Sequence, residues 1–167
     1  TPDFDKGQLE SYLGCPVELT PVTGGQSNPT WFVDTPDRQL VLRKKPLGAT
    51  LSKAHAVERE YRVMDALAGS GVPVPKMVAL EEGSEILGTP FYLMERLAGT
   101  VTEDSALPDF DRMQRRMIYD SAAQVLARLH QVDWIGAGLQ GFGKPTGYFD
   151  RQVAVWRKQW ERSQTRD

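Results

Sequence analysis

Residues 23–46 read TGGQSNPTWFVDTPDRQLVLRKKP, and this stretch decides the fold class. It begins with a glycine-rich segment, which is followed by two apolar runs, residues 31–33 and 40–42. Pro36 and Asp37 stand between the two runs, at positions that favour a tight turn. The stretch therefore predicts a glycine-rich loop that leads into a β-hairpin.

Further strands and helices are predicted on both sides of this hairpin. Apolar residues recur at helical spacing over residues 4–13 and 52–69, which predicts two helices. Apolar runs over residues 17–22, 77–80 and 90–97 are bounded by glycine and proline and predict three more strands. The expected order is five strands with one helix inserted after the third strand.

The pattern of the chain changes after Gly99. Residues 109–132 form one long helical pattern with a broad apolar stripe, and residues 148–160 form a second amphipathic pattern. Strands therefore dominate the first part of the chain and helices the second. We expect an α+β protein with a sheet-containing part over residues 1–98 and a helical part over residues 99–167.

The composition argues against several functional classes. The 167 residues hold 20 Lys plus Arg and 22 Asp plus Glu, so a net charge of −2 gives no general attraction to nucleic acid or to an anionic membrane. Cys15 is the single cysteine, which excludes an intrachain disulfide and a zinc site built from cysteines. The first residues lack the order of a signal peptide, and no apolar run approaches the length of about 18 residues that spans a membrane. We expect a cytoplasmic protein with no nucleic-acid partner and no membrane partner.

Three local features could carry chemistry. The small residues of the segment 23–30 would let backbone N–H groups approach a phosphate, although a plain hairpin turn has the same composition. The next strand ends in Arg43 and Lys44, which could reach a phosphate or simply face solvent. Glu60 lies at the edge of a predicted apolar helix face, where a carboxylate pairs locally or meets a specific cation. None of these features is specific by itself.

Their order along the chain resembles the N-terminal lobe of a kinase. Six segments that together span nearly the whole chain carry a family resemblance: residues 24–30, 41–43, 58–61, 71–75, 92–99 and 126–130. The chain resembles the kinase-like proteins of the aminoglycoside phosphotransferase and choline kinase type, in the branch associated with acyl-CoA dehydrogenases. The resemblance implies a protein kinase-like fold. Residues 1–98 would form the ATP-binding N-lobe, a five-stranded antiparallel sheet with one inserted helix, and residues 99–167 the first helices of a helical C-lobe.

Carried over position by position, the resemblance implies a site for the phosphates of ATP. Arg43 occupies the position at which kinases have a phosphate-binding lysine, and Glu60 on the helix would be its partner. Lys44 is the alternative cation, because a planar guanidinium and a compact ammonium bind phosphate with different geometry. The resemblance also implies that four residues of the glycine-rich loop cover the phosphates, namely Gly25, Gln26, Ser27 and Asn28.

The resemblance further implies an adenine pocket at the end of the last strand. Met94 would guard this pocket, although simple core packing also explains an apolar residue there. The backbone C=O of Glu95 and the backbone N–H of Leu97 would pair with the adenine edge. ATP and magnesium are therefore the expected cofactors.

The groups that catalyse phosphoryl transfer in this family are not found in the sequence. The family uses a His-Gly-Asp type loop, an asparagine shortly after it and a later aspartate that holds magnesium. Asn28 is the only asparagine of the chain, and we interpret His130 and Asp133 as helix-packing and capping residues. We expect no catalytic residue and no metal ligand within these residues, magnesium ligands beyond residue 167, and no phosphate transfer by the chain alone.

Two functional hypotheses follow. In the first, the chain is the nucleotide-binding part of an ATP-dependent small-molecule kinase, and its partners are a nucleotide and a metabolite with a hydroxyl group, such as a hydroxyacyl group. The alternative is a non-catalytic module that binds nucleotide or protein. Both hypotheses predict that the apolar faces of the two late helices are covered, by the remainder of the C-lobe in the first and by a partner in the second.

Overall fold

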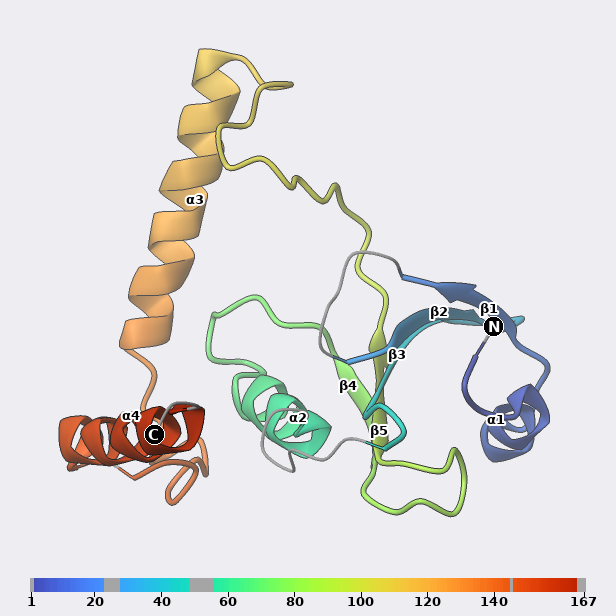
Figure 1. Ribbon diagram of the computed structural model, residues 1–167. Helices are drawn as coiled ribbons and strands as arrows, with labels where there is room; N and C mark the ends of the chain where they lie inside the picture. The colour runs from blue at the N-terminus through green and yellow to red at the C-terminus, as the bar shows by residue number, and fades with distance from the viewer. Residues whose placement is uncertain (1, 23–27, 49–55, 145, 165–167) are drawn as a thin grey trace. The chain divides into compact units, whose positions relative to one another are not determined.

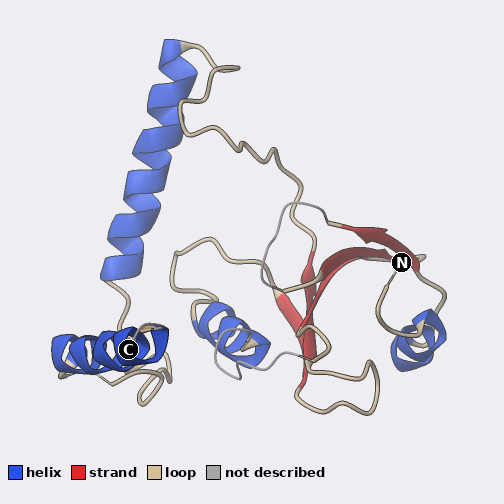
Figure 2. Ribbon diagram, viewed as in Figure 1, coloured by secondary structure: helices blue, strands red, loops and turns tan. Residues whose placement is uncertain are grey.

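A five-stranded antiparallel sheet is the central element of the structure, a computed structural model that describes residues 2–22, 28–48, 56–144 and 146–164. Figure 2 shows the strands in red, and their spatial order in the sheet is β1-β2-β3-β5-β4. Their bounds are β1 Glu18–Pro21, β2 Thr30–Asp34, β3 Gln39–Lys44, β4 Met77–Glu81 and β5 Phe91–Glu95. The predicted five strands, with a helix inserted after the third, are confirmed.

The predicted hairpin joins β2 and β3. Thr35 closes its turn, because its backbone N–H donates to the Arg38 carbonyl at 2.9 Å and its hydroxyl accepts the Arg38 N–H at 2.9 Å. The register pairs Trp31 with Leu42 and Thr30 with Arg43. The hairpin thus places Arg43 opposite the first residue of β2, directly after the glycine-rich segment.

Two helices accompany the sheet (Figure 1). α1 spans Lys6–Leu13, and it begins two residues later than predicted because the Asp5 side chain caps it by accepting the Gly7 N–H at 2.8 Å. Gly14 ends this helix with φ 72°, a left-handed conformation that favours glycine. α2 spans Val57–Ala66, and the predicted start of this helix falls outside the described residues.

The two faces of the sheet have different partners, because successive strand residues point to opposite faces. One face packs against α1 through a core of buried apolar side chains: Leu9, Val17, Trp31, Val33, Leu40, Leu42, Leu87, Phe91 and Leu93. The other face carries Val41, Arg43 and Tyr92, and α2 contacts β4 and β5. We call these the α1 face and the α2 face.

The helical part of the chain contains α3, Arg112–His130, and α4, Tyr148–Ser163. α3 begins three residues later than predicted because Asp111 forms a capping box with Gln114, with bonds of 2.8 and 2.9 Å. The chain divides into two units, residues 1–133 and 134–167, so α3 belongs to the first unit and α4 to the second. The predicted division after residue 98 falls inside the first unit and stays a prediction.

Large apolar side chains of both late helices are exposed. Met117 of α3 is 63% exposed, and Trp156 and Trp160 of α4 are 63% and 66% exposed. None of the helices in the described residues is long and apolar enough to cross a membrane. The apolar faces that the sequence predicts to be covered are therefore open to solvent in this structure.

Candidate functional site

An ion pair between Arg43 of β3 and Glu60 of α2 is the centre of the candidate site. The guanidinium Nε donates to Oε2 of Glu60 at 2.6 Å, and Nη2 lies 3.4 Å from Oε1. The side chains are 28% and 34% exposed, so the pair is partly shielded from water. A guanidinium that faces a carboxylate side-on makes a charge-assisted contact with a defined orientation. The structure therefore brings together the cation and the glutamate that the sequence singled out.

Two neutral donors also hold the Glu60 carboxylate. The Asn28 side-chain amide donates to Oε1 at 2.9 Å, and the Tyr92 hydroxyl donates to Oε2 at 3.0 Å. Asn28 is 4% exposed and Tyr92 is 2% exposed. Burial, and then the negative charge of Glu60, raise the pKa of Tyr92 well above its usual value of 10.0. The phenol is therefore protonated at neutral pH and acts as a donor.

Thr30 connects Arg43 to the segment that follows the glycine-rich loop. Its hydroxyl accepts a hydrogen bond from Nη1 of Arg43 at 3.2 Å and donates to the Asn28 carbonyl at 3.0 Å. The cluster Asn28, Thr30, Arg43, Glu60 and Tyr92, which we call the Glu60 cluster, therefore joins residues from the loop exit, β2, β3, α2 and β5.

Thr30 and Tyr92 belong to the cluster but are not among the predicted site residues. Tyr92 stands directly opposite Arg43 in the register of β3 and β5. These strands are neighbours in the sheet but are separated in the chain by α2 and β4. No local sequence pattern reveals which residues of two such strands lie opposite one another. The only available signal was the alternation that places Tyr92 and Met94 on the same face of β5.

Three of the predicted loop residues, Gly25, Gln26 and Ser27, lie outside the described residues. Their predicted contact with phosphates stays a prediction. Asn28 is described, and the structure places its side chain against Glu60. A contact between Asn28 and the phosphates also stays a prediction. The bond between the Asn28 side chain and Glu60 is one that the sequence did not indicate.

Lys44 does not reach the Glu60 cluster. Its side chain lies on the α1 face and is fully buried, and Nζ donates to Oδ2 of Asp3 at 3.0 Å. The alternative that Lys44 replaces Arg43 is therefore not supported, because the two neighbours point to opposite faces of β3. Lys44 instead joins the N-terminal segment to the sheet.

The predicted adenine-binding residues lie at the end of β5. Met94 stands opposite Val41 in the register and is half-buried. The Glu95 N–H donates to the Lys76 carbonyl at 2.9 Å, and the Lys76 N–H donates to the Glu95 carboxylate at 2.9 Å. In a regular antiparallel pair the Lys76 N–H would donate to the backbone carbonyl of Glu95. Leu97 follows the strand and is 61% exposed. The pairing of Glu95 and Leu97 with adenine stays a prediction.

Arg96, which lies between Glu95 and Leu97, connects this end of β5 to β2. Its guanidinium lies 3.8 Å from the centre of the Phe32 ring, and its Nη1 lies 3.5 Å from Oδ1 of Asp34. The Arg96 N–H donates to the Gln39 carbonyl at 3.1 Å. These contacts anchor the chain directly after β5 to the hairpin that also carries Arg43.

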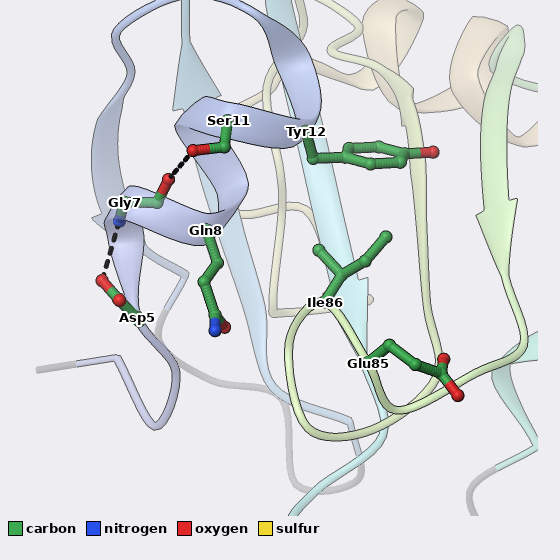
Figure 3. Close-up of a pocket in the computed structure, with 7 residues that line it drawn as sticks. All are labelled: Asp5, Gly7, Gln8, Ser11, Tyr12, Glu85 and Ile86. Atoms are coloured by element: carbon green, nitrogen blue, oxygen red, sulfur yellow. Dashed lines mark hydrogen bonds between the residues drawn. The ribbon is translucent and has the colours of Figure 1, made fainter.

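A pocket on the α1 side of the first unit does not coincide with the Glu60 cluster. Figure 3 shows the residues that line it, which come from α1, from its capping residue and from the segment before β5: Asp5, Gly7, Gln8, Ser11, Tyr12, Glu85 and Ile86. Several of its polar groups are used within the fold, since Ser11 donates to the Gly7 carbonyl at 2.9 Å and the Tyr12 hydroxyl donates to Glu81 at 2.7 Å. None of the predicted ATP-binding residues lines this pocket.

A sheet of this topology, with a cation of its third strand paired to a glutamate of the inserted helix, defines a kinase-like fold. A model of the phosphotransferase enzyme family matches residues 18–167. The chain therefore belongs to this phosphotransferase family, and both the predicted family and the predicted kinase-like fold are confirmed.

Similar proteins include relatives that are much longer than this chain. Acyl-CoA dehydrogenase family member 10 of Mus musculus is 49% identical over 160 residues, which are 96% of this chain and 15% of the relative. Acyl-CoA dehydrogenase family member 11 of Rattus norvegicus is 39% identical over an alignment of 171 positions, which covers 96% of this chain and 22% of the relative. The chain thus spans less than a quarter of the length of these relatives.

Two solved structures are similar in fold. A protein from Ralstonia eutropha JMP134, assigned as an aminoglycoside phosphotransferase, superposes with a TM-score of 0.79 and 42% identity over 98% of this chain and 49% of its own. A thermostable mutant of aminoglycoside phosphotransferase APH(4)-Ia superposes with a TM-score of 0.50 and 18% identity over 74% of this chain, which supports the fold alone.

Proposed function

We propose that the chain forms the ATP-binding part of a small-molecule phosphotransferase, which transfers the γ-phosphate of ATP to a hydroxyl group of a metabolite. The observation that carries this proposal is the 2.6 Å ion pair between Arg43 and Glu60 within a kinase-like sheet. Membership of the phosphotransferase family supports the general reaction. Two further points belong to the proposal: that the acceptor is a hydroxylated metabolite, and that this chain is the ATP-binding part of a longer protein.

In this proposal Arg43 binds phosphate oxygens. A guanidinium carries five N–H donors in a rigid fork that matches the geometry of phosphate. Glu60 and Thr30 fix the plane of the fork, so that little rotational freedom is lost when phosphate binds. Backbone N–H groups of Gly25, Gln26 and Ser27 would cover the same phosphates, as N–H groups in glycine-rich loops do.

The adenine base would bind at the end of β5 in this proposal. The backbone C=O of Glu95 and the backbone N–H of Leu97 would pair with the adenine edge, beside Met94. The contact at Lys76 supports this assignment. The Glu95 carboxylate accepts the Lys76 N–H, which would otherwise donate to the Glu95 carbonyl, so this carbonyl would be left for the adenine edge. Arg96 would keep this segment in register with the hairpin through Phe32.

Magnesium bound to ATP would neutralise charge on the phosphates during transfer. Among the described residues, no three His, Cys, Asp or Glu side chains gather as a metal site. Asn28, the only asparagine of the chain, is bonded to Glu60. We assign nucleotide binding to this chain, and, as the family resemblance implies, we expect the base and the magnesium ligands beyond residue 167.

Calorimetry with Mg-ATP tests the proposal directly. We expect saturable binding by the chain, no release of ADP by the chain alone, and a loss of affinity of at least about tenfold in Arg43→Ala, which corresponds to about 1.4 kcal/mol. The matched control is Lys44→Met, which removes the neighbouring cation on the other face of the sheet and should leave the affinity within about twofold. Absence of ATP binding by a folded chain would contradict the proposal.

In the alternative, a protein-binding module, a partner protein would cover the exposed tryptophans of α4. Trp156 and Trp160 are 63% and 66% exposed and lie beside Phe149 and Val153 on one apolar surface of α4. The two hypotheses differ in one measurement, because a kinase that contains this chain releases ADP in the presence of its acceptor and a binding module does not. Release of ADP by a longer protein carrying the chain, and its loss in Arg43→Ala, would exclude a purely non-catalytic role.

A further inference from the structure

We infer that Asn28 and Tyr92 are positioning residues that hold the Glu60 carboxylate and thereby aim the Arg43 guanidinium at its ligand. The inference rests on the proposed function in taking that ligand to be the phosphates of ATP. It assigns to the Asn28 side chain a role other than contact with nucleotide, and it gives a role to Tyr92, a residue outside the predicted site.

The geometry at Glu60 supports this role. Each carboxylate oxygen lies within 3.5 Å of two donor nitrogen or oxygen atoms: Oε1 faces Asn28 at 2.9 Å and Nη2 of Arg43 at 3.4 Å, and Oε2 faces Nε of Arg43 at 2.6 Å and Tyr92 at 3.0 Å. An ionised carboxylate can accept about four hydrogen bonds. The terminal torsion of a glutamate is otherwise broad and weakly restrained. Asn28 and Tyr92 therefore determine the plane of the carboxylate that Arg43 meets.

The chemistry of the two donors suits this task. Both are neutral at physiological pH, so they orient Glu60 without competing with Arg43 as its counterion. Both are almost completely buried, at 4% and 2% exposure, so water competes little for their bonds to the carboxylate. A second cation at either position would instead weaken the charge pairing between Glu60 and Arg43.

The orientation of Arg43 matters because part of its fork remains available. Within the described part of the chain, Nε, Nη1 and Nη2 each donate once, to Glu60 and Thr30. A guanidinium has five N–H donors, so one hydrogen on each terminal nitrogen is left for a ligand. Rotation of the Glu60 carboxylate would turn these two donors away from a bound phosphate, while the ion pair itself could persist.

The test compares Asn28→Ala and Tyr92→Phe with the matched control Tyr12→Phe, in the complete chain. Tyr12 also donates its hydroxyl to a glutamate, Glu81, at 2.7 Å, but on the α1 side of the sheet. We expect each site variant to weaken Mg-ATP binding by about fivefold, the scale of the net contribution of one typical hydrogen bond. Tyr12→Phe should change the affinity by less than about twofold.

A double-mutant cycle separates positioning from a direct effect. In an Arg43→Ala background, Asn28→Ala and Tyr92→Phe should change the remaining affinity by less than about twofold, because they act through the residue that is missing. A full fivefold effect in that background would overturn the inference. Site variants that lower the melting temperature but bind ATP as tightly as Tyr12→Phe does would also overturn it.

The Arg43 Nε–H resonance in NMR spectra of the chain provides a readout that does not depend on ATP. We expect Asn28→Ala and Tyr92→Phe to shift this resonance and to speed its exchange with water, and Tyr12→Phe to leave it unchanged. An unchanged resonance in both site variants would overturn the inference. If the wild-type chain binds no ATP but the resonance shifts as expected, the proposed function fails while the positioning of Arg43 by these residues is supported.

Discussion

Arg43 and Lys44 are consecutive residues of β3, and their charged groups lie on opposite faces of the sheet. Nε of Arg43 lies 2.6 Å from Glu60 on the α2 face, whereas Nζ of Lys44 lies 3.0 Å from Asp3 on the α1 face. The alternation of the strand thus separates Arg43, which we propose binds phosphate, from Lys44, which joins the N-terminal segment to the sheet.

Replacement of Lys44 should affect stability differently from replacement of Asp3. Asp3→Ala leaves a fully buried ammonium without its carboxylate, and we expect a loss of about 1–3 kcal/mol, below the full cost of breaking a buried pair because Asp3 is one-third exposed. Lys44→Met replaces the ammonium by an apolar group of similar length, and we expect a smaller loss. Chemical denaturation measures both free energies of unfolding. A larger loss in Lys44→Met than in Asp3→Ala would contradict the assignment.

The geometry of Arg43 should matter as well as its charge. Arg43→Lys keeps a cation near Glu60 but loses the planar fork that also reaches Thr30. We expect its affinity for Mg-ATP to lie between those of the wild type and Arg43→Ala, with a loss of about three- to tenfold from the wild type. Arg62→Ala, which removes an exposed arginine of α2, is the control. If Arg43→Lys binds ATP as tightly as the wild type does, the planar guanidinium contributes nothing to the affinity beyond its charge.

The core of the α1 face should account for much of the stability of the sheet. Leu93 is fully buried in this core, while Leu97, four residues later, is 61% exposed. We expect Leu93→Ala to lower the free energy of unfolding by about 2–5 kcal/mol and Leu97→Ala by less than about 0.5 kcal/mol. Urea denaturation of the two variants provides the comparison. Equal losses would show that the core lies elsewhere.

Stability should fall at high pH through Tyr12. Burial, and then the hydrogen bond to Glu81, raise the pKa of Tyr12 from 10.0 to about 12. Between these values the unfolded chain releases the phenolic proton while the folded chain retains it, so its contribution is fully present below pH 10 and is lost as the pH rises to about 12. Tyr12→Phe should therefore show a shallower decline of the free energy of unfolding over this range. Parallel declines in the variant and the wild type would contradict the predicted linkage.

Much of the sheet could be predicted from local sequence. The turn at Pro36 and Asp37, and the apolar runs on either side of it, predict the hairpin that the structure contains. The helix starts were less accurate, because the aspartates that cap α1 and α3 lie within the predicted helical ranges. Periodicity alone does not distinguish a capping residue from the first turn of a helix.

The candidate site was predicted only in part. The family resemblance indicated that Glu60 partners a cation, but the choice between Arg43 and Lys44 required knowledge of which sheet face α2 covers. Tyr92 could not be predicted, because its position opposite Arg43 depends on the pairing of β3 with β5. Such pairing of strands that are distant in sequence is a property of the tertiary fold.

The Glu60 cluster also has a consequence for folding. Glu60 is 17 residues from Arg43 along the chain and 32 residues from both Asn28 and Tyr92. Contacts of such long sequence separation form only after the loops between them have closed. A partly folded chain, or a peptide that carries only the glycine-rich segment and the hairpin, would therefore lack this cluster. A nucleotide that binds the cluster would select completely folded molecules and raise the temperature at which the whole sheet unfolds.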